Sequence, residues 1–388
     1  MPSHAIEIRD LYKIFGPNGA SYVDDVRNGM SKATLNEQHG HVLGLKDINI
    51  TCEGGEITVV MGLSGSGKST LIRHINRLIE PTAGDVLYEG MNITQMSRSE
   101  LQEFRRHKTA MVFQRFALLP HRTVMENAIY GLTIQGIAKD EAQERGQYWL
   151  DRVGLTGYEQ SYPNQLSGGM QQRVGLARAL ANDADILLMD EAYSALDPLI
   201  RMDMQGVLLD LQAELKKTVV FITHDLDEAL RLGDKIAILR DGEVVQQGTG
   251  QEIVLTPADA YISDFVREVN RGRVIMVDTI MTTEPGPTEV VLETGMHLED
   301  AAKRMVEADA HFGSVQDEAG RSIGRVGLQE VISAMVTPIS HEDTSPLGND
   351  NGAPSNVPQG TAAALEEGRR EAEISKAKME QAPVGFMG

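Results

Sequence analysis

Residues 57–75 read ITVVMGLSGSGKSTLIRHI and give the clearest indication of the fold. Its first five residues are continuously apolar, as is typical of a strand buried on both faces of a parallel sheet. Residues 62–69 match the pattern G-x-x-x-x-G-K-[ST], and a helix is expected to begin at Lys68 and to stop before Pro81. Glycines let the backbone wrap around phosphates, and the helix N-terminus adds partial positive charge. Strand, loop and helix together predict a site for a nucleoside triphosphate.

Each side chain of this phosphate loop (residues 62–69) has an expected role. Lys68 would place its ammonium group between the β- and γ-phosphates, and Ser69 would give one oxygen to Mg²⁺. A glycine-rich turn without a ligand is the alternative, and the flanking strand and helix argue against it. The residues expected to contact the nucleotide here are Gly62, Ser64, Gly65, Ser66, Gly67, Lys68, Ser69 and Thr70.

A second pattern, ILLMDE over residues 186–191, ends an apolar run with two acids. Four apolar residues would carry a strand into the core and present Asp190 at its end. Asp190 would hold Mg²⁺ through water, because Mg²⁺ keeps much of its hydration. Glu191 would be the base that orients an attacking water. The alternative is an ordinary strand that ends in two solvated acids.

A third pattern, LSGGMQQ over residues 166–172, predicts a second helix N-terminus suited to an anion. Ser167 is expected to cap a helix that starts at Gly168 and Gly169. One chain cannot readily aim this helix end and the phosphate loop at the same γ-phosphate. Two copies arranged head to tail can do so, which predicts a dimer with shared sites.

Composition excludes several classes of protein. The 388 residues include 36 Lys and Arg against 56 Asp and Glu, a formal net charge of −20. Such an acidic balance disfavours nucleic acid and a basic face for anionic membranes. Cys52 is the only cysteine, so an intrachain disulfide and a thiolate zinc site are excluded. No apolar run approaches the ~18 residues of a membrane span. The N-terminus is too polar for a secretory signal, so a cytosolic multidomain protein is expected.

The chain divides into three zones. Residues 1–272 alternate strand-like and helix-like segments, which predicts an α/β domain with a largely parallel sheet. Within them lie a polar insertion at about 17–44, where Thr34 and Glu37 have capping-box spacing, and a helical region at about 95–182. Residues 273–338 form a smaller α+β unit. Residues 339–388 are polar and expected to be disordered, with a short helix in AAALEEGRREAEISKAKMEQ.

The three patterns together closely resemble the nucleotide-binding subunit of ATP-binding cassette (ABC) transporters. The resemblance implies a P-loop fold with a mostly parallel sheet core, an antiparallel β subdomain and a helical subdomain. It implies ATP and Mg²⁺ as ligands and ATP hydrolysis as the activity. It also implies that Ser167–Gly169 of one copy complete the site of the other.

Four further positions match motifs of this family. Gln114, in MVFQRFALLP, resembles the glutamine that senses Mg²⁺ and the γ-phosphate and faces the membrane subunit. Residues 194–197 resemble the loop that crosses the dimer interface. His224, in FITHD, resembles the switch histidine at the γ-phosphate, with a structural histidine as the alternative. Phe15, in KIFG, falls where the family stacks an aromatic ring on adenine, with a core position as the alternative.

These matches complete the candidate site. The implied catalytic residues are Glu191, His224, Gln114 and Lys68. The implied magnesium ligands are Ser69, Gln114 and Asp190. The implied nucleotide contacts beyond the phosphate loop and Thr70 are Phe15, Gln114, Asp190, Ser167, Gly168, Gly169 and His224.

The resemblance narrows to ATPases of quaternary-amine uptake systems. It rests on the insertion and on the stretches LIRHINRLIEPTAGDVLYEG, DEAYSALDPLIRMDMQ and HDLDEALRLGDKIAILRDGEVVQQGT. It implies a homodimer bound to permease subunits at the cytoplasmic face of the inner membrane. A substrate-binding protein would supply glycine betaine, choline, proline or trimethylamine N-oxide, and no nucleic acid is involved. The alternatives are uptake of another small solute such as an amino acid, a non-transport ABC ATPase, and an ATP-binding regulatory protein.

Residues 273–338 resemble a single CBS-type regulatory repeat. The matching segments are VDTIMTTEP, from Val277, and GMHLEDAAKRMVEADAHFG, from Gly295. Nucleotide-binding copies usually carry Ser or Thr and an Asp after the last strand, where this chain has GLQE at 327–330. A sensor and a small packing or dimerisation domain are the two interpretations.

Overall fold

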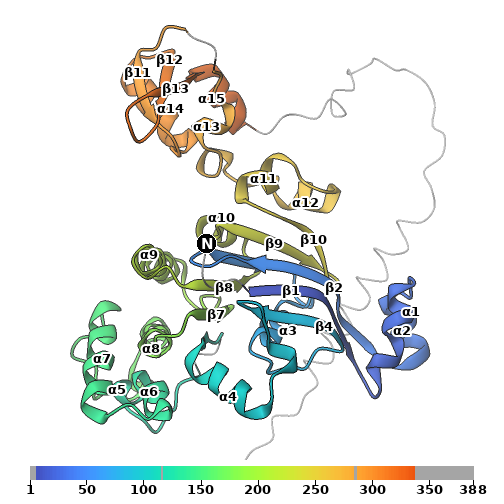
Figure 1. Ribbon diagram of the computed structural model, residues 1–388. Coiled ribbons are helices and arrows are strands. Elements are labelled where there is room, and N and C mark those ends of the chain that lie inside the picture. Colours follow the sequence, from blue (N-terminus) through green and yellow to red (C-terminus); the bar gives the residue numbers. More distant parts are fainter. Residues whose placement is uncertain (1–5, 115–116, 284–285, 337–388) are drawn as a thin grey trace, which may run out of the picture. The chain divides into compact units, whose positions relative to one another are not determined.

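The computed structural model describes residues 6–114, 117–283 and 286–336 (Figure 1). A six-stranded sheet has the order β10-β9-β3-β8-β7-β6. The strands β9, β3, β8, β7 and β6 are parallel to one another, and β10 runs antiparallel at the edge. Their bounds are β3 Ile57–Met61, β6 Thr109–Val112, β7 Ile186–Asp190, β8 Thr218–Thr223, β9 Lys235–Arg240 and β10 Glu243–Gly248. Because parallel strands end at the same edge, the segments that follow β3, β7 and β8 come together there.

A second, antiparallel sheet has the order β2-β1-β4-β5. Its strands are β1 (Ile6–Phe15), β2 (Val42–Cys52), β4 (Ala83–Tyr88) and β5 (Met91–Asn92). Residues of β3 alternate between two cores: Val60 packs with apolar residues of this sheet, and Val59 packs in the core on the opposite face. The expected parallel core and antiparallel β subdomain are therefore present.

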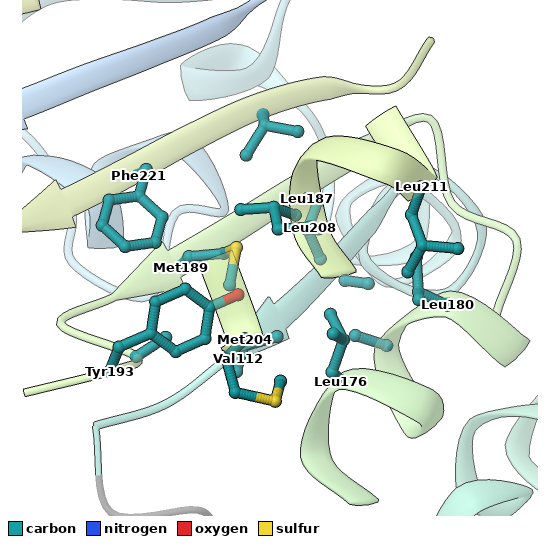
Figure 2. Close-up of a cluster of buried hydrophobic side chains, with 14 of the residues drawn as sticks. Val112, Leu176, Leu180, Leu187, Met189, Tyr193, Met204, Leu208, Leu211 and Phe221 are labelled. Carbon is teal, nitrogen blue, oxygen red and sulfur yellow. The ribbon is translucent and has the colours of Figure 1, made fainter. Parts of the chain in front are cut away.

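The core on that opposite face is closed by helices α8 (Gly168–Ala181) and α9 (Pro198–Leu215). Figure 2 shows side chains of β7, α8 and α9 meeting in this cluster. Burial of each large aliphatic side chain contributes about 1.5–3 kcal/mol, so this cluster fixes β7 and the two acids at its end. The residues labelled there are Val112, Leu176, Leu180, Leu187, Met189, Tyr193, Met204, Leu208, Leu211 and Phe221.

The sequence predicted a helical region at about 95–182, but the structure shows that this region is not wholly helical. The four-residue strand β6 (Thr109–Val112) interrupts it and pairs in parallel with β7 as an edge of the main sheet. A strand this short leaves too few residues for a visible alternation. The helices around it are α4 Arg98–His107, α5 Val124–Ala128, α6 Tyr130–Gln135, α7 Lys139–Arg152 and α8, with short 3₁₀ turns η2 Ile93–Gln95 and η3 Pro163–Gln165.

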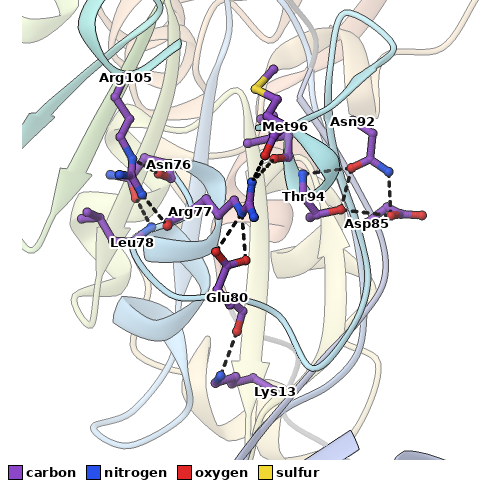
Figure 3. Close-up of polar contacts among 11 residues, drawn as sticks. Lys13, Asn76, Arg77, Leu78, Glu80, Asp85, Asn92, Thr94, Met96 and Arg105 are labelled. Carbon is purple, nitrogen blue, oxygen red and sulfur yellow. Dashed lines mark hydrogen bonds and ion pairs between the residues drawn. The ribbon is translucent and has the colours of Figure 1, made fainter. Parts of the chain in front are cut away.

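Helix α3 (Lys68–Ile75) begins as predicted but ends well before Pro81. Arg77 takes a left-handed conformation with φ 51°, which stops the helix. Its guanidinium donates to Glu80 Oε2 at 2.8 Å and to the carbonyl of Met96 at 2.6 Å (Figure 3). Arg105 of α4 donates to the carbonyl of Asn76 at 2.8 Å. These contacts hold the end of α3 against α4 and η2, and no local pattern reveals them.

The insertion folds as η1 (Gly19–Tyr22), α1 (Val23–Arg27) and α2 (Lys32–His39). A helix was expected here, but its cap is Ser31 and not Thr34. The Ser31 hydroxyl accepts from the Thr34 backbone N–H at 3.0 Å. Ser31 stands three residues before Thr34, which is the same spacing as that from Thr34 to Glu37. Because Ser31 is the cap, Thr34 lies in the first turn of α2.

The smaller unit has its own three-stranded sheet, in the order β11-β12-β13. β11 pairs with β12 in parallel, and β13 pairs with β12 antiparallel. Its elements are α13 Val277–Ile280, β11 Val290–Glu293, α14 Leu298–Glu307, β12 Phe312–Gln316, β13 Ser322–Gly327 and α15 Leu328–Met335. Helix α10 (Leu226–Leu232) connects β8 to β9 within the main sheet. The link from the main sheet to the smaller unit contains α11 Gly250–Leu255, α12 Ala260–Phe265 and η4 Arg271–Arg273. The CBS resemblance stays a prediction, and the expected polar tail at 339–388 lies outside the described residues.

Candidate nucleotide-binding site

The phosphate loop connects β3 to α3, as predicted. Gly62 has φ +150°, and a Cβ there would lie 2.1 Å from the Leu239 carbonyl oxygen, so only glycine fits this turn. Lys68 Nζ donates to the carbonyls of Gly62 at 2.7 Å and Leu63 at 3.0 Å. Burial lowers the pKa of Lys68, and the neighbouring Glu191 partly opposes that shift. The ammonium group is thus fixed against the loop by two carbonyls.

Two predicted magnesium ligands meet at the edge of the sheet. Ser69 Oγ donates to Asp190 Oδ1 at 2.8 Å, and the Arg73 guanidinium lies 3.4 Å from Asp190 Oδ2. Asp190 is buried. A hydroxyl and a carboxylate are oxygen ligands of the kind Mg²⁺ prefers. Ser66 Oγ is also buried and has no hydrogen-bond partner among the described residues. The residues present therefore fit a magnesium–phosphate group.

Glu191 is the meeting point of three predicted residues. Gln114 Nε2 donates to Glu191 Oε2 at 2.9 Å, and His224 Nδ1 lies 3.6 Å from the same oxygen. Gln114 also donates to Ser194 Oγ at 3.3 Å, and that hydroxyl donates to the Glu191 carbonyl at 3.0 Å. Glu191 itself is held at φ +46° at the end of β7. A carboxylate oriented in this way can accept a proton from a water placed beside the phosphate loop.

A cavity of ≈ 300 Å³ lies beside the phosphate loop. We call it the nucleotide cavity. It runs from Phe15 to Glu191 and includes Lys68. Phe15 is 39% exposed, so it is not a core residue, and Lys13 Nζ lies 5.0 Å from the centroid of its ring. A Cβ on Gly44 would lie 2.6 Å from ring atom Cε2. The other lining residues are Lys32, Val42, Leu43, Gly44, Ser64, Gly65, Gly67, Ser69 and Thr70.

The three residues of the LSGG pattern lie apart from this cavity. Ser167, Gly168 and Gly169 are absent from its lining. Ser167 caps α8 as predicted, since its hydroxyl accepts from the Met170 N–H at 3.3 Å. One chain therefore gathers most of the candidate residues and leaves this helix end outside, which is the arrangement expected if a second copy supplies it.

Three residues near the site were missed from the sequence. Arg73 could have been found, because it lies four positions after Ser69 on the same helix face. Lys32 reaches the cavity through the packing of the insertion on β1 and β2, and Gly44 through the pairing of β2 with β1; no local pattern encodes either.

The fold and the site together define an ATPase of the ABC type. Residues 45–194 match the family model described as "ABC transporter". The chain is 48% identical over 331 residues to the "Glycine betaine/proline betaine transport system ATP-binding protein ProV" of Escherichia coli (strain K12), across 85% of this chain and 82% of that protein. It is 42% identical over 336 residues to the "Trimethylamine N-oxide transport system ATP-binding protein TmoW" of Pelagibacter ubique (strain HTCC1062), across 86% and 97% of the two chains.

A solved structure, "Dimeric Structure of MJ0796, a Bacterial ABC Transporter Cassette", matches with a TM-score of 0.54 and 33% identity. It covers 63% of this chain and 98% of the other. The chain belongs to the ABC transporter family as an ATP-binding subunit that hydrolyses ATP, and the resemblance inferred from the sequence is confirmed. Among the described residues, no helix has both the length and the apolar character needed to cross a bilayer. Nor does that part of the chain contain a group of three or more His, Cys, Asp or Glu suited to a metal ion.

Proposed function

We propose that this chain powers the uptake of a quaternary or methylated amine of the glycine betaine, choline, proline or trimethylamine N-oxide type. One observation carries the proposal. The likeness to the betaine transport protein of E. coli extends over 331 residues, well beyond the cassette match at 45–194. A second candidate is an amino acid, because the chain is also 40% identical over 263 residues to the "Methionine import ATP-binding protein MetN 2" of Lactiplantibacillus plantarum.

We further propose a homodimer with two shared ATP sites. Each site would take the phosphate loop and Phe15 from one copy and residues 167–169 from the other. The position of residues 167–169 outside the nucleotide cavity supports this arrangement. ATP would hold the two copies together because both contribute to its binding, and hydrolysis would remove that link.

The chemistry within each site is assigned to residues that already lie together. Ser69 and Asp190, with Gln114, would hold Mg²⁺, which neutralises charge on the β- and γ-phosphates. Glu191 would orient the attacking water and accept its proton, and Gln114 fixes the direction of that carboxylate. His224, whose Nδ1 lies 3.6 Å from Glu191 Oε2, would stabilise the transferring phosphoryl group.

The solute would be moved by partners. The surface at 114–127 would pass the opening and closing of the dimer to a transmembrane permease at the cytoplasmic face of the inner membrane. A substrate-binding protein would deliver the solute to that permease. Nucleic acid is not an expected partner, because the net charge is −20.

The test is reconstitution of the chain with its permease and binding protein in liposomes. ATP hydrolysis and solute uptake would be measured against a panel of glycine betaine, choline, proline, trimethylamine N-oxide and methionine. Stimulation by a methylated amine supports the proposal, and stimulation by methionine alone overturns it in favour of amino-acid import. The Glu191→Gln variant, reconstituted in the same way, supplies the baseline without turnover.

A further inference from the structure

We propose that the insertion at 17–44 is part of the ATP site, and that Lys32 binds the adenosine end of the nucleotide. This rests on the assignment of the nucleotide cavity to ATP. Lys32 is the first residue of α2, and it lines that cavity together with Phe15 and the phosphate loop.

The insertion is fixed to the antiparallel sheet by a core of its own. Leu35 of α2 is fully buried and packs in one cluster with Ile14 of β1 and Leu43 of β2. Ile14 and Leu43 are paired across the two strands, one position before the Phe15–Val42 pair. Leu35 therefore ties α2 to the strand positions next to Phe15. Lys32 lies one helical turn before Leu35, on the same side of α2.

A second anchor closes the base of the insertion. The ring nitrogens of His41 lie 2.6 Å from the Pro17 carbonyl and 2.7 Å from the His39 carbonyl. The same ring packs on Tyr22, with the ring centroids 4.6 Å apart. Because both ends of the insertion are held, the position of Lys32 at the cavity is set by the fold.

Lys32 is the charged hydrogen-bond donor that lines this end of the cavity. Lys13 Nζ also lies 5.0 Å from the centroid of the Phe15 ring, but it donates to the Glu80 carbonyl at 2.8 Å and does not line the cavity. Among the residues that line the cavity, the charged groups are Lys68 and Glu191 at the phosphate end and Lys32 on the wall with Phe15. The side chains of Phe15, Val42 and Leu43 can stack on or pack against a base but carry no hydrogen-bond donor. A lysine ammonium has three donors, and adenosine presents acceptor nitrogens on its base and acceptor oxygens on its ribose.

The present partner of Lys32 leaves it free to bind. Its Nζ lies 3.6 Å from Asp241 Oδ1, and both side chains are well exposed, at 42% and 77%. Exposed pairs of this kind contribute about 0–1 kcal/mol. Asp241 belongs to the turn between β9 and β10, whose Gly242 N–H donates to the Ser66 carbonyl in the phosphate loop at 3.0 Å. Asp241 therefore keeps the Lys32 ammonium beside the cavity, and breaking this ion pair when a nucleotide binds would cost little free energy.

The experiment compares equilibrium binding of an ATP analogue with a β,γ-imido bridge to full-length variants. Lys32→Ala is expected to weaken binding about three- to tenfold, as for loss of a partly exposed charged donor, and Lys32→Arg is expected to recover part of that loss. Lys139→Ala, which removes an exposed lysine on α7, is the matched control and should bind like the wild type. Equal affinity of Lys32→Ala and the wild type would overturn the inference.

Two further measurements separate a nucleotide contact from a structural one. Asp241→Asn should bind the analogue at least as well as the wild type, because Lys32 loses a competing partner. If Asp241→Asn instead loses as much affinity as Lys32→Ala, the ion pair matters only for the shape of the loop, and the inference fails. Inorganic tripolyphosphate, which fills only the phosphate end of the cavity, should bind Lys32→Ala and the wild type with equal affinity. If Lys32→Ala loses as much affinity for tripolyphosphate as for the ATP analogue, the inference is overturned. Failure of the wild type to bind the analogue would reject the ATP assignment of the cavity itself.

Discussion

Ser69 Oγ donates a 2.8 Å hydrogen bond to Asp190 Oδ1, which joins the first turn of α3 to the end of β7. The two residues are 121 positions apart in the sequence. They meet because β3 and β7 lie on either side of β8 and end at the same edge of the sheet. The pair is thus the point at which the phosphate loop and the acidic strand form one site.

Replacement of Ser69 by alanine should raise the Mg²⁺ concentration needed for half-maximal ATP hydrolysis. The change removes one expected ligand and leaves Asp190 without its hydroxyl donor, at a cost of about 1–3 kcal/mol to the bound state. Titration of phosphate release with MgCl₂ measures the shift, and chelation of divalent cations should stop turnover in the wild type. Ser99→Ala, on the exposed face of α4, is the control. An unchanged Mg²⁺ requirement in Ser69→Ala would remove Ser69 from the ligand set.

Glu191→Gln should keep ATP binding but lower turnover by about 10²- to 10⁴-fold, the usual contribution of a general base. Glutamine has nearly the same shape, its amide oxygen can still accept from Gln114, and the backbone carbonyl of residue 191 still accepts from Ser194, so the loss reports on the carboxylate. The variant should also trap a closed dimer with ATP, because the link between the copies is no longer removed. Phosphate release and light scattering in the presence of ATP measure the two effects. Normal hydrolysis would reject Glu191 as the base.

Much of the site could be predicted because its key segments are continuous in the sequence. A buried strand, a glycine loop and a helix fall within residues 57–75, so their order alone specifies the phosphate site. The same holds for β7, whose apolar run ends at Asp190. Ser167 could be assigned as a cap because a hydroxyl before two glycines satisfies the first N–H groups of a helix.

The remaining features depend on contacts between distant segments. Gln114 and Glu191 are 77 positions apart, and their hydrogen bond follows from strand order and not from spacing. The early end of α3 depends on a hydrogen bond from the Arg77 guanidinium to the carbonyl of Met96, which lies in a separate turn of the chain. The place of Lys32 in the cavity depends on the packing of Leu35 against β1 and β2. Each of these requires the tertiary fold.

Gly44→Ala should weaken ATP binding by displacing the Phe15 ring. A Cβ at this position would lie 2.6 Å from ring atom Cε2 and 3.4 Å from the Lys13 carbonyl oxygen, so the ring must move. Base stacking contributes roughly 1–3 kcal/mol, and partial loss of it predicts an increase in Kd of about fivefold or more. Gly206→Ala is the control, because a Cβ there meets nothing within 4 Å. Unchanged nucleotide affinity in Gly44→Ala would place the base away from Phe15.

The buried His74 of α3 should make the protein less stable in mild acid. Its Nδ1 lies 2.7 Å from the Thr70 carbonyl, its Nε2 is buried without a partner among the described residues, and burial lowers the pKa of His74 to about 4. The unfolded chain, with a histidine pKa near 6.5, binds more protons than the folded chain as the pH falls below that value. The stability contribution is therefore present above about pH 6.5 and is lost as the pH falls towards about 4.

Lowering the pH from 7 to 5 should reduce the free energy of unfolding by about 2 kcal/mol through His74. Urea unfolding at the two pH values measures the loss. His74→Gln, which cannot take up a proton but can still donate to Thr70, should flatten this dependence even if it lowers stability at pH 7. His121→Gln, at an exposed position, should retain the wild-type difference. An identical pH dependence in His74→Gln and the wild type would assign the acid sensitivity to other groups.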